Sequence, residues 1–315
     1  MKTFLKVVLS IAAVILLTYI GNASFVIWGA VAGLVCSVLI IISVNKADVL
    51  FAIGLFQYGK DRHEAAYKFM KSAYATTKLA PNKVLLYSYM MIRDGKLTDA
   101  EAVLNKVTFL NRRDLSKVDL MNARINRAII LWKQDKLPEA IELLEEAYGQ
   151  NMMSTTLYGT LGYFYILNNQ LAKALEFNKE AYEYNSENAV IADNLAYNYI
   201  LYSDFEKAEE IYKKVLAAKP QFIEPYYNYA LLLEKRMQSR EAIEYYKKAL
   251  KFPEKYLSII THESIYEAIE RLEAGKITLD TVLEDDISPS VEQSEEIQSD
   301  EQTEVVSETD KGIEE

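Results

Sequence analysis

Residues 205–220 read FEKAEEIYKKVLAAKP, and this stretch carries the pattern that decides the fold. Within it, Ala208 is followed by the bulky Tyr212 four positions later and by Val215 seven positions later. Residues at these spacings lie on one face of an α-helix, and a small side chain there lets a second helix approach closely. The stretch therefore predicts a helix that packs tightly on a neighbouring helix.

The same pattern returns along the chain at a fixed interval. Six alanines, called the marker alanines below, are its predicted packing residues: Ala66, Ala100, Ala140, Ala174, Ala208 and Ala242. They are 34 residues apart, except that 40 residues separate the second from the third. We place the six additional residues in the polar segment 111–116. A period of this length in helical sequence predicts stacked helix pairs.

This pattern resembles the tetratricopeptide repeat family, whose unit is a helix-turn-helix of about 34 residues. With Ala208 aligned to the second small position of the unit, Ala196 falls on the first small position, Tyr199 and Tyr212 fall on aromatic positions, and Pro220 falls on the terminal proline. The resemblance covers residues 47–253. It implies an all-α solenoid of about six repeats, wound as a right-handed superhelix, and a role in binding protein partners.

Residues 1–46 predict an α-helical transmembrane hairpin. Residues 4–20 are mostly apolar and residues 25–44 carry no charge, so each stretch is long enough for a helix that crosses a bilayer. The four residues 21–24 between them favour a tight turn. Lysines precede the first span and follow the second. The positive-inside rule then places both ends, and the repeats, on the cytoplasmic side of a cell membrane that the chain crosses twice.

Other interpretations of this region stay open. The first apolar stretch and Ala23 also fit a secretory signal peptide, although cleavage there would leave an apolar span at the new terminus. Asn22 lies in a formal glycosylation motif. Gly29, Gly33 and Ser37 form a ridge of small residues that predicts packing inside the hairpin or, alternatively, self-association with a second copy.

Two segments follow the repeats. Residues 254–276 predict a C-terminal capping helix with a polar outer surface, which would shield the last repeat from water. Residues 277–315 predict a disordered acidic tail. From residue 280 onward there are 14 acidic residues and one lysine, so the tail accounts for the net charge of −10. Such a composition cannot bury enough apolar surface to fold.

The resemblance also implies where a ligand would bind, because the first helices of such repeats line an inner groove. The expected groove residues are Tyr89, Ile125, Ile129, Trp132, Tyr163, Ile166, Tyr197, Ile200, Tyr227 and Leu231. Amphipathic aromatic and aliphatic side chains of this kind favour an extended or helical peptide with apolar anchors. The alternative is that these rings pack against neighbouring repeats.

No catalytic, metal-binding or cofactor-binding pattern is present. The two histidines, His63 and His262, are far apart, and Cys36 is the only cysteine. Glycine-rich phosphate loops and the nucleophile motif GxSxG are missing. We therefore expect no enzymatic activity, no cofactor, no metal and no nucleic-acid partner.

Three functional hypotheses remain from the sequence. The first is a membrane-tethered cytoplasmic scaffold that binds a protein or peptide in its groove. The second is a structural subunit that joins an integral membrane complex through its hairpin. The third is an enzyme whose site has no recognisable motif, which would predict turnover by the fragment from Asp48 onward.

Overall fold

The computed structural model describes residues 9–16, 19, 26–110 and 115–285. Within this part all regular secondary structure is helical. Three predicted features lie wholly or largely outside it: the turn at 21–24, the insertion at 111–116 and the tail predicted at 277–315, of which residues 277–285 are described and are helical.

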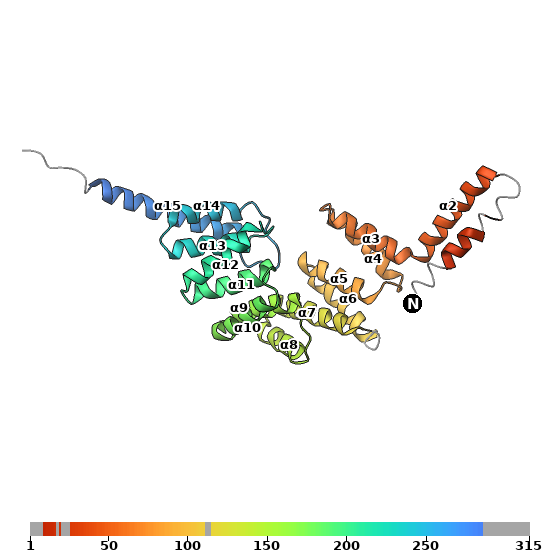
Figure 1. Ribbon diagram of the computed structural model, residues 1–315, viewed down its shortest axis with the longest axis horizontal. Helices are drawn as coiled ribbons and strands as arrows, with labels where there is room; N and C mark the ends of the chain where they lie inside the picture. Colours follow the sequence, from red (N-terminus) through yellow and green to blue (C-terminus); the bar gives the residue numbers. More distant parts are fainter. Residues whose placement is uncertain (1–8, 17–18, 20–25, 111–114, 286–315) are drawn as a thin grey trace, which may run out of the picture. The chain divides into compact units, whose positions relative to one another are not determined.

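The helices that follow the first apolar stretch are numbered in chain order in Figure 1. Their bounds are α2 (Val26–Val44), α3 (Lys46–Tyr58), α4 (His63–Ala75), α5 (Pro81–Arg93), α6 (Leu97–Leu110), α7 (Lys117–Lys133), α8 (Leu137–Gly149), α9 (Thr155–Leu167), α10 (Leu171–Tyr184), α11 (Ala189–Leu201), α12 (Phe205–Ala217), α13 (Glu224–Lys235), α14 (Ser239–Ala249) and α15 (His262–Asp285).

Helices α3 to α14 pack as successive pairs, α3 with α4 through α13 with α14, and every pair is closed by the same turn (Figure 1). Five positions before each marker alanine, one residue has a left-handed backbone with φ between 55° and 73°. These residues are Asp61, Gly95, Asp135, Asn169, Ser203 and Met237. The next residue donates its backbone N–H to the carbonyl five positions back, as Asp204 does to Tyr199 at 2.9 Å. This bond satisfies a carbonyl at the end of the first helix.

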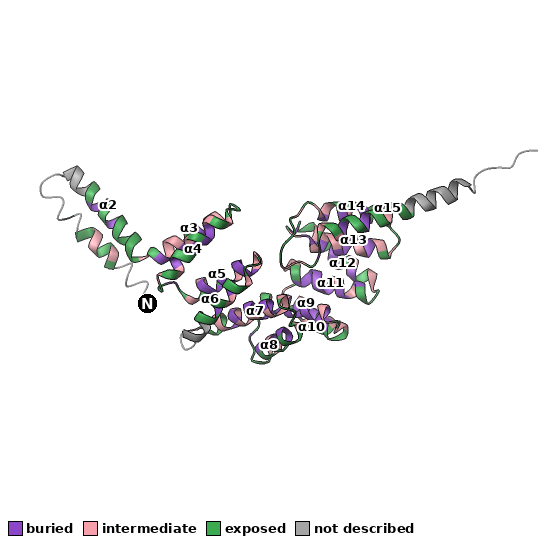
Figure 2. Cartoon of the chain, turned by 180° about the vertical axis from the view of Figure 1, so that it is seen from behind, coloured by how far each residue is buried: buried purple, intermediate pink, exposed green. Residues whose placement is uncertain are grey.

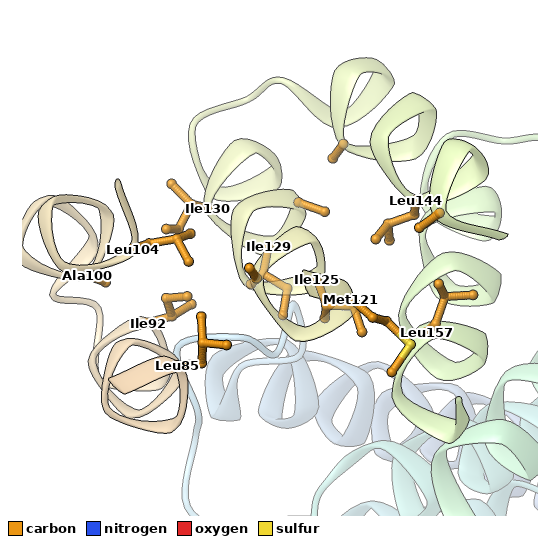
Figure 3. Packing of buried hydrophobic residues seen from close by; sticks show 14 of the residues in the cluster. Leu85, Ile92, Ala100, Leu104, Met121, Ile125, Ile129, Ile130, Leu144 and Leu157 are labelled. Atoms are coloured by element: carbon orange, nitrogen blue, oxygen red, sulfur yellow. The ribbon is translucent and has the colours of Figure 1, made fainter. Parts of the chain in front are cut away.

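The marker alanines lie where the helices meet, and all six are 0% exposed. Large apolar side chains fill the space around them. In Figure 3, Ile125 and Ile129 of α7 lie between Leu85 of α5 and Leu157 of α9, which belong to one continuous core. Burial of such side chains, favoured by the close approach at the alanines, holds neighbouring pairs together.

Asparagine side chains form a second link between neighbouring pairs. Asn126 Nδ2 of α7 donates to the Leu85 carbonyl of α5 at 2.9 Å, and Asn194 Nδ2 of α11 donates to the Gly159 carbonyl of α9 at 2.8 Å. The first link spans 41 residues and the second spans 35. The difference of six residues is the insertion that the alanine spacing indicates between α6 and α7.

Most residues of helix α2 whose burial is described are exposed, and its large apolar side chains are among them (Figure 2). Gly33 and Ser37 are buried, and Ser37 Oγ donates to the Gly33 carbonyl at 2.6 Å. Leu34, between them, is 59% exposed. Residues 9–16 form a further helical segment (Figure 1). Gly29 lies within α2.

Among the described residues, no single helix has both the length and the apolar character needed to cross a membrane. Residues Val31–Val44 of α2 and the following α3 meet those criteria only as a pair, which is bent by 84°.

The segment after α14 differs from the predicted helix at 254–276, because α15 begins only at His262. Thr261 and Ser264 cap that helix. The Ser264 backbone N–H donates to Thr261 Oγ1 at 3.1 Å, and the Thr261 N–H donates to Ser264 Oγ at 3.3 Å. Residues 252–261, called the strap below, are not helical and lie along the array. Helix α15 continues from the compact unit 1–269 into a second unit, 270–315.

Candidate functional site

A cavity of about 430 Å³ lies between the first helices of four successive pairs, α5, α7, α9 and α11. The strap and the start of α13 complete its border. We call it the groove cavity. It is within the size range of small-molecule and peptide side-chain pockets, and most of its lining is apolar or aromatic.

Three aromatic rings form one wall of the groove cavity. Trp132 lies in the last turn of α7, and Tyr163 and Phe164 lie in α9. The Trp132 ring centroid is 5.9 Å from that of Tyr163, at 89°, and 5.4 Å from that of Phe164. Such edge-to-face contacts fix the ring orientations. Gly159 lies one turn before Tyr163 and also lines the cavity, where it adds no side chain.

The strap borders the groove cavity through Lys255, Leu257 and Ser258, and its Tyr256 packs on Gly95 of the array. Gly95 has a left-handed backbone, and a Cβ atom placed on it would lie 3.2 Å from Tyr256 Cδ2, so the tyrosine ring packs directly on the glycine. Lys133 Nζ lies 4.9 Å from the Tyr256 ring centroid and 4.1 Å from that of Trp132. Leu257 packs on the core of the array. Burial lowers the pKa of Lys133.

The first turn of α11 forms another wall. The Asn188 side chain accepts hydrogen bonds from the backbone N–H groups of Val190 and Ile191, both at 3.1 Å, and so caps the helix. Val190, Asp193 and Asn194 line the cavity from this turn. The cap therefore holds the segment that carries them.

Asp193 is a buried carboxylate in that wall. It accepts a hydrogen bond from the Tyr212 hydroxyl at 3.0 Å and two from Asn228 Nδ2, at 3.1 and 3.2 Å. Burial, helped by the nearby charge of Glu224 and opposed by the hydrogen bonds from Asn228 and Tyr212, raises the pKa of Asp193 to about 7. Burial, together with the charges of Glu224 and Asp193, also raises the pKa of Tyr163.

A second cavity of about 230 Å³ lies between α5 and α7. Leu85, Tyr89 and Ile125 are among its lining residues, and Tyr89 also lines the groove cavity. Thr156 of α9 also lines both, so the two cavities meet at these two residues.

The predicted groove residues fall into three groups. Those that line the groove cavity are Tyr89, Ile129, Trp132 and Tyr163. Ile125 lines the second cavity, although it and Ile129 are almost fully buried. The residues outside both cavities are Ile166, Tyr197, Ile200, Tyr227 and Leu231. Ile166 and Ile200 are buried, and the Tyr227 ring contacts that of Tyr246 at 5.3 Å.

Several lining residues were not among the predicted groove residues. Phe164 follows Tyr163 directly and lies one position outside the expected groove register. Phe222 and Leu257 belong to segments without helical periodicity. Asp193 lies on the first helix of its pair, one turn before the predicted groove residue Tyr197, but its carboxylate is held by Tyr212 and Asn228 from later helices.

Outside the groove cavity, the most closely bonded titratable cluster is centred on Asp94. His63 Nδ1 lies 2.5 Å from Asp94 Oδ2, and the hydroxyls of Tyr58 and Tyr67 donate to the same carboxylate at 2.8 and 2.7 Å. The hydrogen bond to Asp94 raises the pKa of His63. The cluster ties α3 and α4 to the end of α5. In the described part of the chain, no three His, Cys, Asp or Glu side chains gather as metal ligands.

The sequence comparisons identify one repeat directly. Residues 223–256 match the family model described as tetratricopeptide repeat, and this stretch holds α13, α14 and the start of the strap. Among curated proteins, none matches the sequence of this chain.

Solved structures extend the similarity to most of the chain. A tetratricopeptide repeat protein from Parabacteroides merdae aligns with a TM-score of 0.58 at 12% identity, covering 84% of this chain and 99% of that protein. The structure of pilF from Pseudomonas aeruginosa aligns with a TM-score of 0.52 at 14% identity, covering 73% of this chain and 97% of that one. At such identities the similarity shows the fold alone. Together with the family match it supports a tetratricopeptide repeat array, a fold that typically serves as a non-catalytic scaffold for protein interactions.

Proposed function

We propose that this chain is a membrane-tethered scaffold whose repeat array binds a protein or peptide partner in the groove cavity. The observation that carries this proposal is the wall formed by Trp132, Tyr163 and Phe164 beside a cavity of about 430 Å³. Tryptophan and tyrosine are enriched among the residues that dominate binding energy, because each offers a large and rigid contact surface.

The shape of the site favours a peptide segment with apolar anchors. The cavity crosses four first helices, from Tyr89 of α5 to Val190 of α11, so a ligand would run across the repeats. The strap already borders one side of this path through Lys255, Leu257 and Ser258. A partner therefore either packs beside the strap or displaces it.

The hairpin at residues 1–46 supplies the proposed tether to a cell membrane, with the array on the cytoplasmic side. Its sequence carries two apolar stretches, and α2 exposes large aliphatic side chains such as Leu34 and Leu39. Only Asn45 separates α2 from α3, so no flexible linker lies between hairpin and array. Tethering would raise the effective concentration of the array near membrane partners, so even a weak groove would be useful.

A second candidate is a structural subunit that joins an integral membrane complex through its hairpin. The exposed aliphatic face of α2 favours it, because that face offers packing surface to other transmembrane helices. In this case the array would act as a spacer and the groove would not select the partner.

One co-purification experiment separates the two candidates. The full chain is purified from native membranes as wild type, as Trp132→Ala with Tyr163→Ala, and as Gly33→Leu, with Tyr202→Ala as the control for an exposed tyrosine outside the cavity. Loss of two hot-spot aromatics is expected to weaken binding by about thirtyfold or more. The groove variant should therefore lose the partner while Gly33→Leu and Tyr202→Ala retain it.

The opposite pattern would favour the subunit candidate. If Gly33→Leu alone releases the partners, the hairpin is the binding surface. If the groove variant keeps every partner with unchanged thermal unfolding, the groove proposal is wrong.

A further inference from the structure

Two carboxylates, Asp193 and Glu224, line one corner of the groove cavity without a cationic partner. Asp193 is 6% exposed, and its hydrogen-bond donors, Tyr212 and Asn228, are both neutral. Glu224 is the first residue of α13 and is half-buried. Among the described residues, no lysine, arginine or histidine forms an ion pair with either of them.

A buried carboxylate without a positive partner lowers the stability of the folded protein, so the groups around it indicate what could compensate its charge. Removing a charge from water is compensated only by close opposite charge or by several hydrogen bonds. The neutral bonds to Asp193 compensate in part, since burial and the charge of Glu224 still raise its pKa to about 7. A cation placed between the two carboxylates would favour the charged form of both.

The corner also offers an aromatic ring to such a cation. Tyr163 lines the same cavity as the two carboxylates, and the charges of both Glu224 and Asp193 contribute to the raised pKa of its hydroxyl. A positive group is attracted to the face of an aromatic ring as well as to a carboxylate. Cation-binding sites in proteins commonly combine these two features.

Two positive residues, Arg93 and Lys255, line the cavity, and a third, Lys133, contacts the lining residue Trp132. Lys133 lies between the rings of Trp132 and Tyr256. Arg93 comes from the last turn of α5, which is the opposite end of the row of helices, and Lys255 on the strap is exposed. The cavity thus has a positive side near α5 and a negative corner near α11 and α13.

We propose that the corner formed by Asp193, Glu224 and Tyr163 binds a positively charged side chain, lysine or arginine, of the partner peptide. The inference rests on the proposed function, because it assigns one position of the ligand that the groove would hold. The apolar anchors of the same peptide would pack on Trp132 and Phe164. The charge on the ligand would then fix its direction across the repeats.

The test uses the full chain in detergent micelles with Trp28→Phe, which leaves Trp132 as the only tryptophan and thus as the reporter. The probes are N-acetylated, C-amidated hexapeptides with an aromatic residue at one position and arginine or citrulline at another, scanned over all positions. Citrulline has nearly the shape of arginine but no charge. For one arrangement we expect arginine to bind about tenfold more tightly than citrulline.

Variants of the two carboxylates show which residues cause the preference for arginine over citrulline. Glu224→Gln and Asp193→Asn should each bring the ratio between the two peptides toward one, whereas Glu142→Gln, an exposed carboxylate of α8 outside the cavity, should leave it unchanged. Thermal unfolding accompanies every variant. If Asp193→Asn disturbs the fold, Glu224→Gln decides alone, because in the described part of the chain no hydrogen bond or ion pair of the Glu224 side chain links one helix to another.

The outcomes distinguish this inference from the proposed function. If peptides bind and quench Trp132 but arginine and citrulline do so equally, the cationic corner is wrong and the groove remains. If the preference persists in Glu224→Gln and in folded Asp193→Asn, the cation binds elsewhere and the inference is again wrong. If no peptide of the set binds, the groove proposal fails and this inference fails with it.

Discussion

The hairpin and the repeat array distribute their apolar side chains in opposite ways. In the array, large and small side chains are buried together, and Leu144 is as fully enclosed as the marker alanines. In α2, Gly33 and Ser37 are buried while Leu34, between them, is 59% exposed (Figure 2). The same types of side chain therefore have opposite environments in two regions of one chain.

The difference follows from how polar residues are spaced. In the array, apolar residues recur at helical spacing with charged residues between them, so each helix has one face to bury and one to solvate. The stretch at 26–44 contains no charged residue and has no polar face. Two short helices cannot bury apolar residues on all sides. The chain builds the surroundings of the array core itself, whereas the outer face of α2 depends on surroundings outside the chain.

The largest effect should come from shortening a leucine in each region. Leu144→Ala leaves a cavity in the core and is expected to lower the free energy of unfolding of the array by about 2–5 kcal/mol. Leu34→Ala removes an exposed side chain and should change it by less than about 0.5 kcal/mol. Denaturant unfolding of the full chain in detergent micelles, followed by circular dichroism, measures both. Equal losses would show that α2 belongs to the same core.

The second effect concerns charge, since the array buries a carboxylate and the stretch at 26–44 has none. Asp193 has a pKa of about 7 in the folded chain, above its ordinary value, so the folded state holds a proton that the unfolded state has released. The stability of the wild type should therefore fall as pH rises from about 4 to 7, by at most about 1.4 kcal/mol per pH unit from this group.

Asp193→Asn lacks that titration. Its stability relative to the wild type should rise through the same pH interval and level off above pH 7. Glu224, Tyr212 and Tyr163 face the same carboxylate, and Glu224→Gln serves as the matched variant because it removes only the neighbouring charge. Denaturant unfolding between pH 4 and 8 gives the slope. A parallel pH dependence of Asp193→Asn and wild type would contradict the buried charge.

The third effect comes from enlarging a small residue. Ala208 is 0% exposed, so Ala208→Leu should overpack the contact between helices and cost about 1–3 kcal/mol. Ala32 of α2 is exposed, and Ala32→Leu should leave the stability of the array unchanged. Thermal midpoints of the two variants report the difference. If Ala208→Leu has the same thermal midpoint as the wild type, the marker alanines do not control how closely the helices approach.

Much of the array could be predicted from the sequence, because the marker alanines report a physical requirement. A helix pair that packs at close distance needs a small side chain at the contact. The interval between alanines in the sequence therefore gives the interval between helix contacts along the array. The sequence did not indicate the left-handed turn that precedes each marker alanine. Its left-handed position is occupied by residues as different as Asn169, Ser203 and Met237, because the packed helices impose the turn.

The groove cavity could be predicted only in part. Trp132 and Tyr163 follow from their register on the first helices. The strap does not, because its apolar residues Leu257 and Ile260 contact distant helices and leave no period in the sequence. The helix expected at 254–276 begins only after Thr261 for a local reason, since the Thr261 and Ser264 side chains cap the start of α15 at His262.

The smallest effect tests whether packing imposes the turns of the array. Met237 has φ of 62° and an almost fully exposed side chain. Its left-handed backbone therefore costs conformational free energy that side-chain contacts do not offset. A non-glycine residue costs about 1–2 kcal/mol there, while glycine loses about 0.5–1 kcal/mol through the entropy of the unfolded chain. Met237→Gly should therefore stabilise the array by about 0.5–1 kcal/mol.

The junction between hairpin and array provides the matched control for Met237→Gly. Asn45, between α2 and α3, has φ of −105°, and its side chain donates to the Ile41 carbonyl at 2.9 Å. Asn45→Gly relieves no left-handed strain and loses that bond, so it should destabilise slightly where Met237→Gly stabilises. Thermal unfolding of both variants gives the sign. If Met237→Gly also destabilises, the left-handed turn is not strained, and the local sequence rather than helix packing determines its geometry.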